Sequence, residues 1–568
     1  MTAAGTLSAC GGSSAGAAND GKTFSNGVVA TVHPLVTTAG VNALRRGNAV
    51  DAAIAAALTL GVVDQHNSGL GGGCFILIRR ADGKVLAIDG RETAPAKAAR
   101  DMYLRDGKPE PEWSQTGPLA VATPGALAAY ELALQRAGKL KLADVILPAT
   151  EIAEQGFPLD SNYARKLKST AEKLKLFPGS AAALLKADGS AYAEGEVLKQ
   201  PELANSYRQI AKHGSEWFYR GEFAESVGRW MKENKGLLTA EDFAAYKPLF
   251  REPLRTTYRR LEIIGFPPPS SGGVHVAQML NMLELSDLAG LQAGGPPGGF
   301  EHLLAEVMKL AFADRAHWLG DPDFAQVPRG LIDKDYAREL ARRLTGKSLD
   351  VPSHGRPPRA TENVFTQDPN YDPAESKHTT HIAAADAAGN WVAITQTVNT
   401  TFGSKVIVPG TGIVLNNEMD DFSISPGQPN AFGLIGAEAN AVVAGKRPLS
   451  SMSPTIVLDG ERPILSVGAA GGPTIITQVL QVLVRVLDLK QPLAEALAAP
   501  RLHHQWRPDV LRIENSLPEG TQTALTGRGH KLEKTSGIGV CQAVGLNSAT
   551  KQLVGVHDPR VPGSAAGF

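Results

Sequence analysis

Two predicted strands follow directly after a long segment without periodicity, and this arrangement constrains the fold more than any other feature. Residues 346–377 are rich in Pro, Asp, Asn and Ser, which predicts an exposed, mobile linker. The stretches Thr379–Asp386 and Trp391–Asn399 that follow are apolar and β-branched, and Ala388–Asn390 between them predicts a turn. The sequence therefore predicts a buried hairpin whose first strand starts immediately behind a linker.

The first residue of this hairpin has the functional groups of a catalytic nucleophile. If the bond between His378 and Thr379 is cut, Thr379 carries both a hydroxyl nucleophile and an α-amino base. An α-amino group has a reference pKa of about 7.7 to 8.0, so it serves as a base near neutral pH. The alternative is that Thr379 and Thr380 simply begin a strand, as β-branched residues often do. Spacing alone favours this second interpretation.

The rest of the chain alternates helical and strand patterns. The longest apolar run, Ala52–Val63, is shorter than the roughly 20 residues that span a bilayer, and it predicts a buried helix. Amphipathic helical patterns run from Leu119 to about Lys247, and short strands such as Arg259–Ile264 and GIVLNN alternate with helices afterwards. The glycines of Asn67–Gly73 predict a backbone that passes close to other elements. The fold class is α/β with much antiparallel pairing.

Composition excludes some function classes. The 57 basic and 57 acidic residues give no net charge, which disfavours a nucleic-acid partner and a polybasic membrane-surface protein. Cys74 and Cys541 lie in apolar stretches and are expected to be inert core thiols. The histidines show no metal-ligand spacing, with His503 and His504 too isolated, so no metal site is predicted.

The N-terminus carries a separate signal. Leu7–Gly11 resembles a bacterial lipoprotein cleavage box, followed by a Gly/Ser/Ala tether to about residue 20. Cys10 would then carry a lipid anchor, and the protein would be periplasmic or membrane-anchored facing the periplasm. The charged and apolar regions that precede such a box are missing from the first six residues, which leaves a chance match open.

Many separate motifs agree with one family in its order along the chain. They include HNSGLGGGCF, DGRETAP, PSSGGVH, FADRAHWLGDPDF, HTTHIAAAD, TQTVNTTFGS, GIVLNNEMDDFS, KRPLSSMSPTIV and VGAAGGPTIITQV. From about Val28 to its end, the chain resembles the γ-glutamyltranspeptidase family, glutathione hydrolases of the N-terminal nucleophile hydrolase superfamily.

This resemblance implies a four-layer αββα sandwich formed as one structural domain. It implies self-cleavage between His378 and Thr379 into a large fragment, 21–378, and a small fragment, 379–568, which stay associated as a heterodimer. It also implies hydrolysis or transfer of the γ-glutamyl group of glutathione and other γ-glutamyl amides through an ester on Thr379. Water, an amino acid or a dipeptide accepts the group, and no cofactor or metal takes part.

The resemblance also assigns site residues. A γ-glutamyl group ends in a carboxylate and an ammonium, and each charge needs a partner when it is desolvated. The implied set is Arg91, Ser450 and Ser451 for the carboxylate, Asn399, Glu418 and Asp421 for the ammonium, Thr397 to position the nucleophile, and Gly471 and Gly472 as the oxyanion hole. Taken singly, each has an ordinary alternative: a surface cation, a serine turn, a solvated acidic loop, or a Gly-rich strand-to-helix turn.

One position departs from the family pattern. The segment 426–446 matches the lid loop that covers the pocket in many members, and Phe432 stands where an aromatic residue with a hydroxyl often occurs. A phenylalanine can close the pocket by packing but cannot make the phenolic hydrogen bond. The strength of gating, and with it the balance of hydrolysis and transfer, is left open.

Two rival functions stay open from the sequence. A β-lactam side-chain acylase of the same family would cleave glutaryl-type amides, which lack the ammonium that Glu418 and Asp421 are expected to bind. A periplasmic solute-binding lipoprotein is suggested by the Cys10 tether. That protein would have two strongly similar lobes and no self-cleavage.

Overall fold

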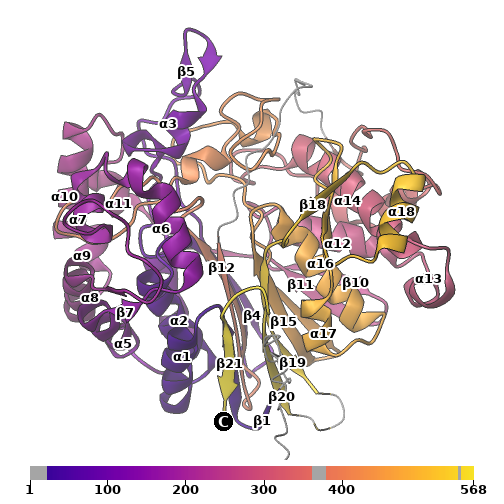
Figure 1. Cartoon of the computed structure of the whole chain (residues 1–568), viewed down its shortest axis with the longest axis horizontal. Helices are drawn as coiled ribbons and strands as arrows, with labels where there is room; N and C mark the ends of the chain where they lie inside the picture. The colour runs from indigo at the N-terminus through magenta and orange to yellow at the C-terminus, as the bar shows by residue number, and fades with distance from the viewer. Residues whose placement is uncertain (1–21, 361–378, 548–549, 551) are drawn as a thin grey trace, which may run out of the picture.

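Two seven-stranded antiparallel sheets stack face to face at the centre of the molecule (Figure 1). The first, here called the hairpin sheet, has the order β21 (Ser564–Gly567), β2 (Gly27–Thr31), β12 (Thr380–Asp386), β13 (Trp391–Thr397), β3 (Gly73–Arg79), β4 (Val85–Gly90), β9 (Leu249–Arg251). The second sheet has the order β1 (Thr23–Phe24), β20 (Leu553–His557), β19 (Val540–Leu546), β15 (Arg462–Ala470), β14 (Thr455–Asp459), β11 (Leu261–Gly265), β10 (Leu254–Tyr258).

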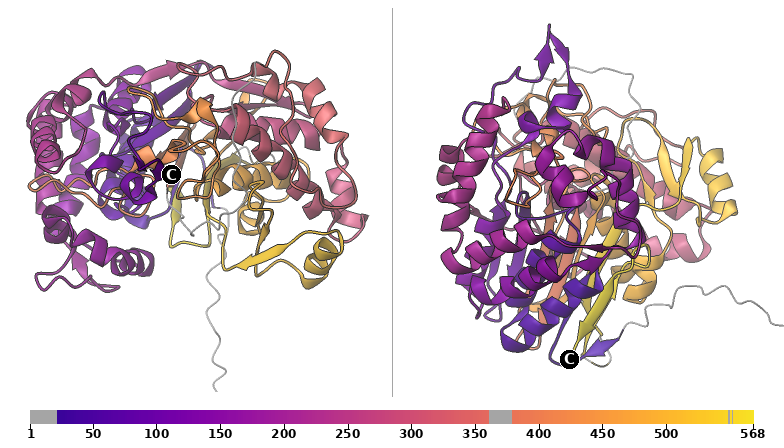
Figure 2. Two further views of the ribbon diagram at one scale, coloured as in Figure 1. Left: turned by 90° about the horizontal axis from the view of Figure 1, so that it is seen from above. Right: turned by 60° about the vertical axis from the view of Figure 1, so that its left-hand side comes forward.

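Helices cover the outer face of each sheet, which gives the expected αββα sandwich (Figure 2). The hairpin-sheet layer contains α1 (Pro34–Arg46), α2 (Ala49–Val63), α4 (Ala126–Ala137), α5 (Leu142–Gln155) and α8 (Pro201–His213), with α6 (Ser161–Leu174), α7 (Pro178–Leu184), α9 (Glu216–Tyr219), α10 (Glu222–Glu233) and α11 (Ala240–Ala245) around them. The other layer contains α12 (Gly272–Leu283), α14 (Gly299–Trp318), α15 (Lys334–Ala341), α16 (Thr474–Leu487) and α17 (Leu493–Ala498).

Smaller elements complete the chain. They are α3 (Pro111–Gln115), α13 (Leu288–Gly294), α18 (Glu519–Gly527), a three-stranded sheet of β16 (Leu502–His503), β17 (Leu511–Glu514) and β18 (Leu532–Thr535), and the ribbons β5 (Leu104–Arg105) with β6 (Lys108–Pro109) and β7 (Phe157–Pro158) with β8 (Val197–Leu198). The structure, a computed structural model, describes residues 22–360, 379–547, 550 and 552–568. Cys10 and His378 lie outside the described residues.

The predicted hairpin occupies the middle of its sheet. β12 and β13 pair antiparallel, with Thr380 opposite Gln396, so Thr379 directly precedes the first strand at the level of Thr397. Every residue of both strands is buried, because helices lie on one face and the second sheet on the other. The hairpin thus places the predicted nucleophile at one end of the central strands.

The predicted buried helix is α2. Its first turn is capped because the Asn48 side chain accepts hydrogen bonds from the amides of Val50 and Asp51, while Asp51 accepts from the Asn48 amide at 2.8 Å. Every residue of α2 is buried, and the helix packs on α1, α5 and the hairpin. The small alanine side chains allow this close approach on all sides.

Three local predictions need correction. GIVLNN is not a strand, because it crosses strand ends: the Asn416 amide donates to the Gly71 carbonyl at 2.9 Å, and the Asn417 amide to the Val398 carbonyl at 3.2 Å. The strand expected over Arg259–Ile264 is the second arm of the β10–β11 hairpin, with Arg259 in its turn. The described part of the predicted linker, 346–360, is partly packed on α14, as the Trp318 indole donates to the Gly355 carbonyl.

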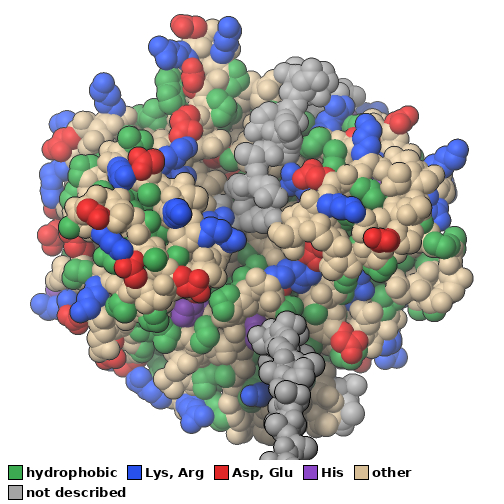
Figure 3. Space-filling view, in the orientation of Figure 1, with side chains coloured by type: hydrophobic (Ala, Val, Ile, Leu, Met, Phe, Trp, Pro, Cys, Tyr) green, Lys and Arg blue, Asp and Glu red, His purple; other side chains and the backbone are tan. Residues whose placement is uncertain are grey.

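Other expectations are met. Cys74 and Cys541 are buried and unbonded, and burial raises the pKa of both thiols. Acidic and basic side chains are interspersed on the face of the molecule in Figure 3, without a broad field of one sign. Within the described ranges, no helix is long and apolar enough to cross a bilayer.

Candidate active site

Thr379 lies at the entrance to β12 with its side chain almost fully buried. Its hydroxyl donates to the Thr397 hydroxyl at 3.2 Å, and the Thr397 oxygen also accepts from the Asn399 amide at 2.9 Å. The backbone of Thr379 has φ = 114°, a region that β-branched residues avoid. Such a conformation costs of the order of 1–3 kcal/mol and is found mainly at functional sites. The structure therefore holds the predicted nucleophile oriented and strained.

Gly471 and Gly472 connect β15 to α16 with φ = 130° and 58°. A Cβ on Gly472 would lie 2.6 Å from the Phe432 ring, and one on Gly471 would lie 2.4 Å from the Thr474 hydroxyl oxygen. Within the described chain, neither glycine amide donates a hydrogen bond. Two free amides beside Thr379, with no room for side chains, suit an oxyanion hole.

Arg91 directly follows β4 and is completely buried. Its guanidinium forms ion pairs with both Glu418 and Asp421, which belong to one 3₁₀ turn (Glu418–Asp421), and its Nε donates to the Pro448 carbonyl at 3.0 Å. Burial alone would lower the pKa of Arg91, but the two carboxylates raise it. The residues expected to bind opposite ends of the substrate therefore bind one another here.

A third carboxyl group adjoins this ion-pair cluster. Glu92 Oε2 lies 3.6 Å from Arg91 Nη1, and burial raises the pKa of Glu92 to about 7. Burial also raises the pKa of Glu418 well above its usual range, against the opposing effect of Arg91. Both Glu92 oxygens and Glu418 Oε2 are buried without a hydrogen-bond partner among the described residues. Such atoms are costly unless a donor reaches them, and an ammonium would be one.

Ser450 and Ser451 lie beside this cluster, in the segment that follows Pro448. The Ser450 hydroxyl oxygen accepts from the Met452 amide at 3.1 Å, and that of Ser451 accepts from Arg315 Nη2 at 3.2 Å. Ser271 donates to the Ser450 carbonyl through both its amide and its hydroxyl, each at 2.7 Å. Sequence reasoning gave Ser271 and Arg315 no role, although both lie in motifs that carry the family resemblance.

Phe432, in the segment predicted to form a lid, is buried against Gly472. No phenolic hydroxyl is needed to hold the segment, because its backbone makes the contacts: the Phe432 carbonyl accepts from Gln505 at 3.2 Å, and the Ala431 amide donates to Asp420 at 2.9 Å. Backbone hydrogen bonds to Gln505 and Asp420, which the sequence did not indicate, therefore hold this segment in place of a phenolic hydrogen bond.

A cavity of about 350 Å³ opens at Thr379 and Gly471. None of the Arg91 cluster lines it. Its wall carries charges of both signs, contributed by Asp160, Arg165, Lys166 and Arg560. It also contains His33, whose pKa burial lowers, and Asp64, whose pKa burial raises to about 8. Arg165 is exposed, donates to Asn162 at 2.6 Å, and forms no ion pair with any described residue. The cavity, which Thr379 lines, and the Arg91 ion-pair cluster are therefore separate regions of the molecule.

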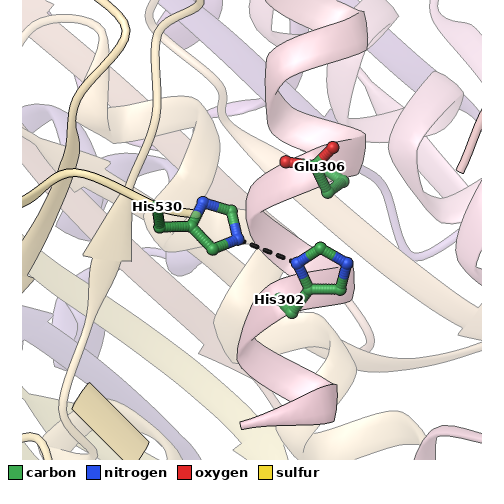
Figure 4. A group of neighbouring side chains, drawn as sticks. All are labelled: His302, Glu306 and His530. Atoms are coloured by element: carbon green, nitrogen blue, oxygen red, sulfur yellow. Dashed lines mark hydrogen bonds between the residues drawn. The ribbon is translucent and has the colours of Figure 1, made fainter. Parts of the chain in front are cut away.

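One side-chain group among the described residues has the composition of a metal site: His302, Glu306 and His530 (Figure 4). Their atoms already satisfy one another. His302 Nδ1 lies 2.8 Å from His530 Nε2, His302 Nε2 lies 2.7 Å from the Thr345 carbonyl, and the buried Lys309 ammonium lies 3.3 Å from Glu306. Through these contacts the group ties α14 to neighbouring segments.

Comparisons with known proteins agree with this geometry. The family model for gamma-glutamyltranspeptidase matches residues 36–568. The chain is 42% identical over 537 residues to a glutathione hydrolase proenzyme of Escherichia coli, covering 94% of this chain and 90% of the relative. It is 39% identical to an acylase ACY 1 proenzyme of Pseudomonas sp. (strain V22), covering 92% and 90%. The cephalosporin acylase from Bacillus halodurans superposes with a TM-score of 0.86 at 27% identity, covering 99% of both chains.

Proposed function

Since this chain belongs to the gamma-glutamyltranspeptidase family, we propose that it hydrolyses and transfers the γ-glutamyl group of glutathione and related γ-glutamyl amides. The observation that carries the proposal is the cluster of buried Arg91, buried Glu418 and partly exposed Asp421 beside two serine hydroxyls. This cluster supplies one set of partners for a carboxylate and another for an ammonium. A γ-glutamyl group presents both charges on one carbon.

The reaction follows from the groups around Thr379. The Thr379 hydroxyl oxygen attacks the substrate's γ-carbonyl while its proton passes to the α-amine of the same residue. The tetrahedral oxygen forms beside the free amides of Gly471 and Gly472. The C–N bond breaks, the amine returns the proton to the leaving nitrogen, and a γ-glutamyl ester stays on Thr379. Water or the amine of an acceptor amino acid or dipeptide then attacks the ester and frees the threonine.

Maturation uses the same hydroxyl. Thr379 attacks the carbonyl of His378, and hydrolysis of the resulting ester frees the amine and separates residues 379–568 from the preceding fragment. The positive φ of Thr379 favours this step, because cleavage relieves a backbone conformation that costs free energy in the intact chain. Both fragments contribute strands to the hairpin sheet, so they stay associated as a heterodimer.

An acylase for glutaryl amides is the second candidate, favoured by the similarity to two acylases. Glu418 and Asp421 argue against it, because two neighbouring carboxylates, one of them fully buried, repel each other, and an incoming ammonium offsets this repulsion whereas a glutaryl group does not. The solute-binding alternative is wrong: the chain forms one sandwich of stacked sheets rather than two similar lobes.

The test compares γ-glutamyl and glutaryl anilides with the purified, cleaved protein. We expect kcat/KM for the γ-glutamyl compound to exceed that for the glutaryl compound at least tenfold, equivalent to about 1.4 kcal/mol. Equal rates would replace this proposal with the acylase.

A lipid anchor at Cys10 and a periplasmic location belong to the proposal as well, supported by the Leu7–Gly11 motif. Phase separation of the full chain in a detergent tests them. The unchanged protein should enter the detergent phase and Cys10→Ser the aqueous phase, and identical partitioning would remove the anchor.

A further inference from the structure

Arg315 is a buried cation that neither the reaction nor the family resemblance uses. It belongs to α14 and is 4% exposed, and no carboxylate of the described residues lies within ion-pair distance of it. Its Nε donates to the Ser271 hydroxyl at 3.0 Å and its Nη2 to the Ser451 hydroxyl at 3.2 Å. Burial lowers the pKa of Arg315 only to about 10, so it stays charged at neutral pH. Asp421 acts on it only from beyond ion-pair distance, so this buried cation has no direct ion pair with a described residue and is available to bind an anion.

The hydrogen bonds that the Ser450 and Ser451 oxygens accept leave the protons of both hydroxyls available for donation. The Ser451 oxygen accepts from Arg315, and the Ser450 oxygen accepts from the Met452 amide. Each hydroxyl can therefore still donate its own hydrogen to another acceptor. Neither hydroxyl donates to another described residue. Two O–H donors next to an unpaired guanidinium form a site for an acceptor with negative charge, such as a carboxylate.

The electrostatic surroundings agree with this assignment. Asp421 is close enough to Arg315 to raise its pKa, so Arg315 and the Arg91 cluster share one electrostatic environment. Burial raises the pKa of both Glu92 and Glu418, which favours their neutral forms and reduces the repulsion that a carboxylate would meet there.

We propose that Arg315 is a second cation of the acyl-binding site, which orients the Ser451 hydroxyl as a donor beside that of Ser450 and makes the site selective for acyl groups that carry a carboxylate. Arg91 alone does not supply this charge, since its guanidinium is already engaged by Glu418 and Asp421. The inference rests on the proposed function, because it assumes that the acyl group enters beside Arg91.

Three anilides with the same leaving group test it: γ-glutamyl, glutaryl, which lacks the ammonium, and 4-aminobutyryl, which lacks the carboxylate. Arg315→Met should lower kcat/KM at least tenfold for the first two compounds and at most about twofold for the third. In the double variant with Ser451→Ala, kcat/KM should fall by less than the product of the two single-variant losses. Both substitutions remove the same contact between Arg315 and Ser451.

Lys309→Met is the matched control, since Lys309 is a buried cation on the same helix that contacts Glu306 and Ser348 instead of the site. It should leave the ratios among the three substrates unchanged. If Arg315→Met fails to fold, judged by missing self-cleavage, Arg315→Lys replaces it, with a smaller loss confined to the two carboxylate compounds. An equal loss for all three compounds, or no loss, overturns the role of Arg315. A wild-type protein inactive on γ-glutamyl anilide refutes the proposed function instead.

Discussion

The Arg91 cluster and the cavity at Thr379 satisfy their charges in opposite ways. In the cluster, which is the proposed acyl side, Arg91 and Glu418 are buried, and Arg91 pairs with both Glu418 and the partly exposed Asp421. On the cavity side, Arg165 is exposed and has no ion-pair partner among the described residues. Electrostatic interactions are strong in the first environment and screened by solvent in the second. From this difference we infer that selectivity for the acyl group and tolerance for the leaving group come from separate regions.

The largest expected effect comes from substitution of Thr379, the proposed nucleophile. Thr379→Ala removes the hydroxyl that both cleavage and catalysis need, so the protein should stay one chain of about 60 kDa without measurable turnover. Thr379→Ser keeps a hydroxyl and should still cleave. Mass spectrometry of both purified variants is the measurement, and two fragments from Thr379→Ala would contradict the nucleophile assignment.

Arg91→Lys tests whether Arg91 binds the acyl group. A lysine keeps the charge but cannot contact Glu418, Asp421 and the Pro448 carbonyl together, so KM for γ-glutamyl anilide should rise about a hundredfold, or about 2.7 kcal/mol. Self-cleavage, which needs no substrate, should persist. Arg220→Lys, in an exposed helix ion pair, is the control and should leave KM unchanged. An unchanged KM for Arg91→Lys would remove Arg91 from the site.

Asp421→Asn has a smaller expected effect and tests the ammonium pocket. Loss of one carboxylate should reduce kcat/KM for γ-glutamyl anilide at least about tenfold, roughly 1.4 kcal/mol, because the ammonium loses a partner. The glutaryl compound, without an ammonium, should be turned over relatively better by the variant than by the wild type. Steady-state kinetics on both anilides decide, and parallel losses would mean that Asp421 acts on structure alone.

The sequence predicted the parts of this site that depend on local pattern. Alternation and the Gly389 turn located the hairpin that carries Thr379 and Thr397, and the apolar run from Ala52 located α2. The family resemblance supplied the identities of the acyl-side residues. These features are encoded within a few residues of one another or within one motif.

What the sequence did not predict depends on contacts between distant segments. Arg91 and Glu418 are 327 positions apart, and no periodicity indicates that they pair. Arg315 reaches Ser451 across 136 positions, and Gln505 holds the lid at Phe432 across 73. GIVLNN resembles a strand locally, yet its amides bind Gly71 and Val398 from other segments. Tertiary contacts overrode the local pattern there.

The smallest expected effect is that of Arg165→Ala in the cavity, and it tests whether the cavity is less selective than the Arg91 cluster. Arg165 lines the cavity at Thr379 but is exposed, so solvent screens its charge. Arg165→Ala should change kcat/KM for an uncharged γ-glutamyl anilide by less than about twofold, whereas a carboxylated anilide as leaving group should lose slightly more. Both rates, measured at low and at high salt, provide the check, because screening should erase even the small difference. A tenfold loss with the uncharged anilide would show that the cavity side binds as selectively as the acyl side, and the proposed division between them would not hold.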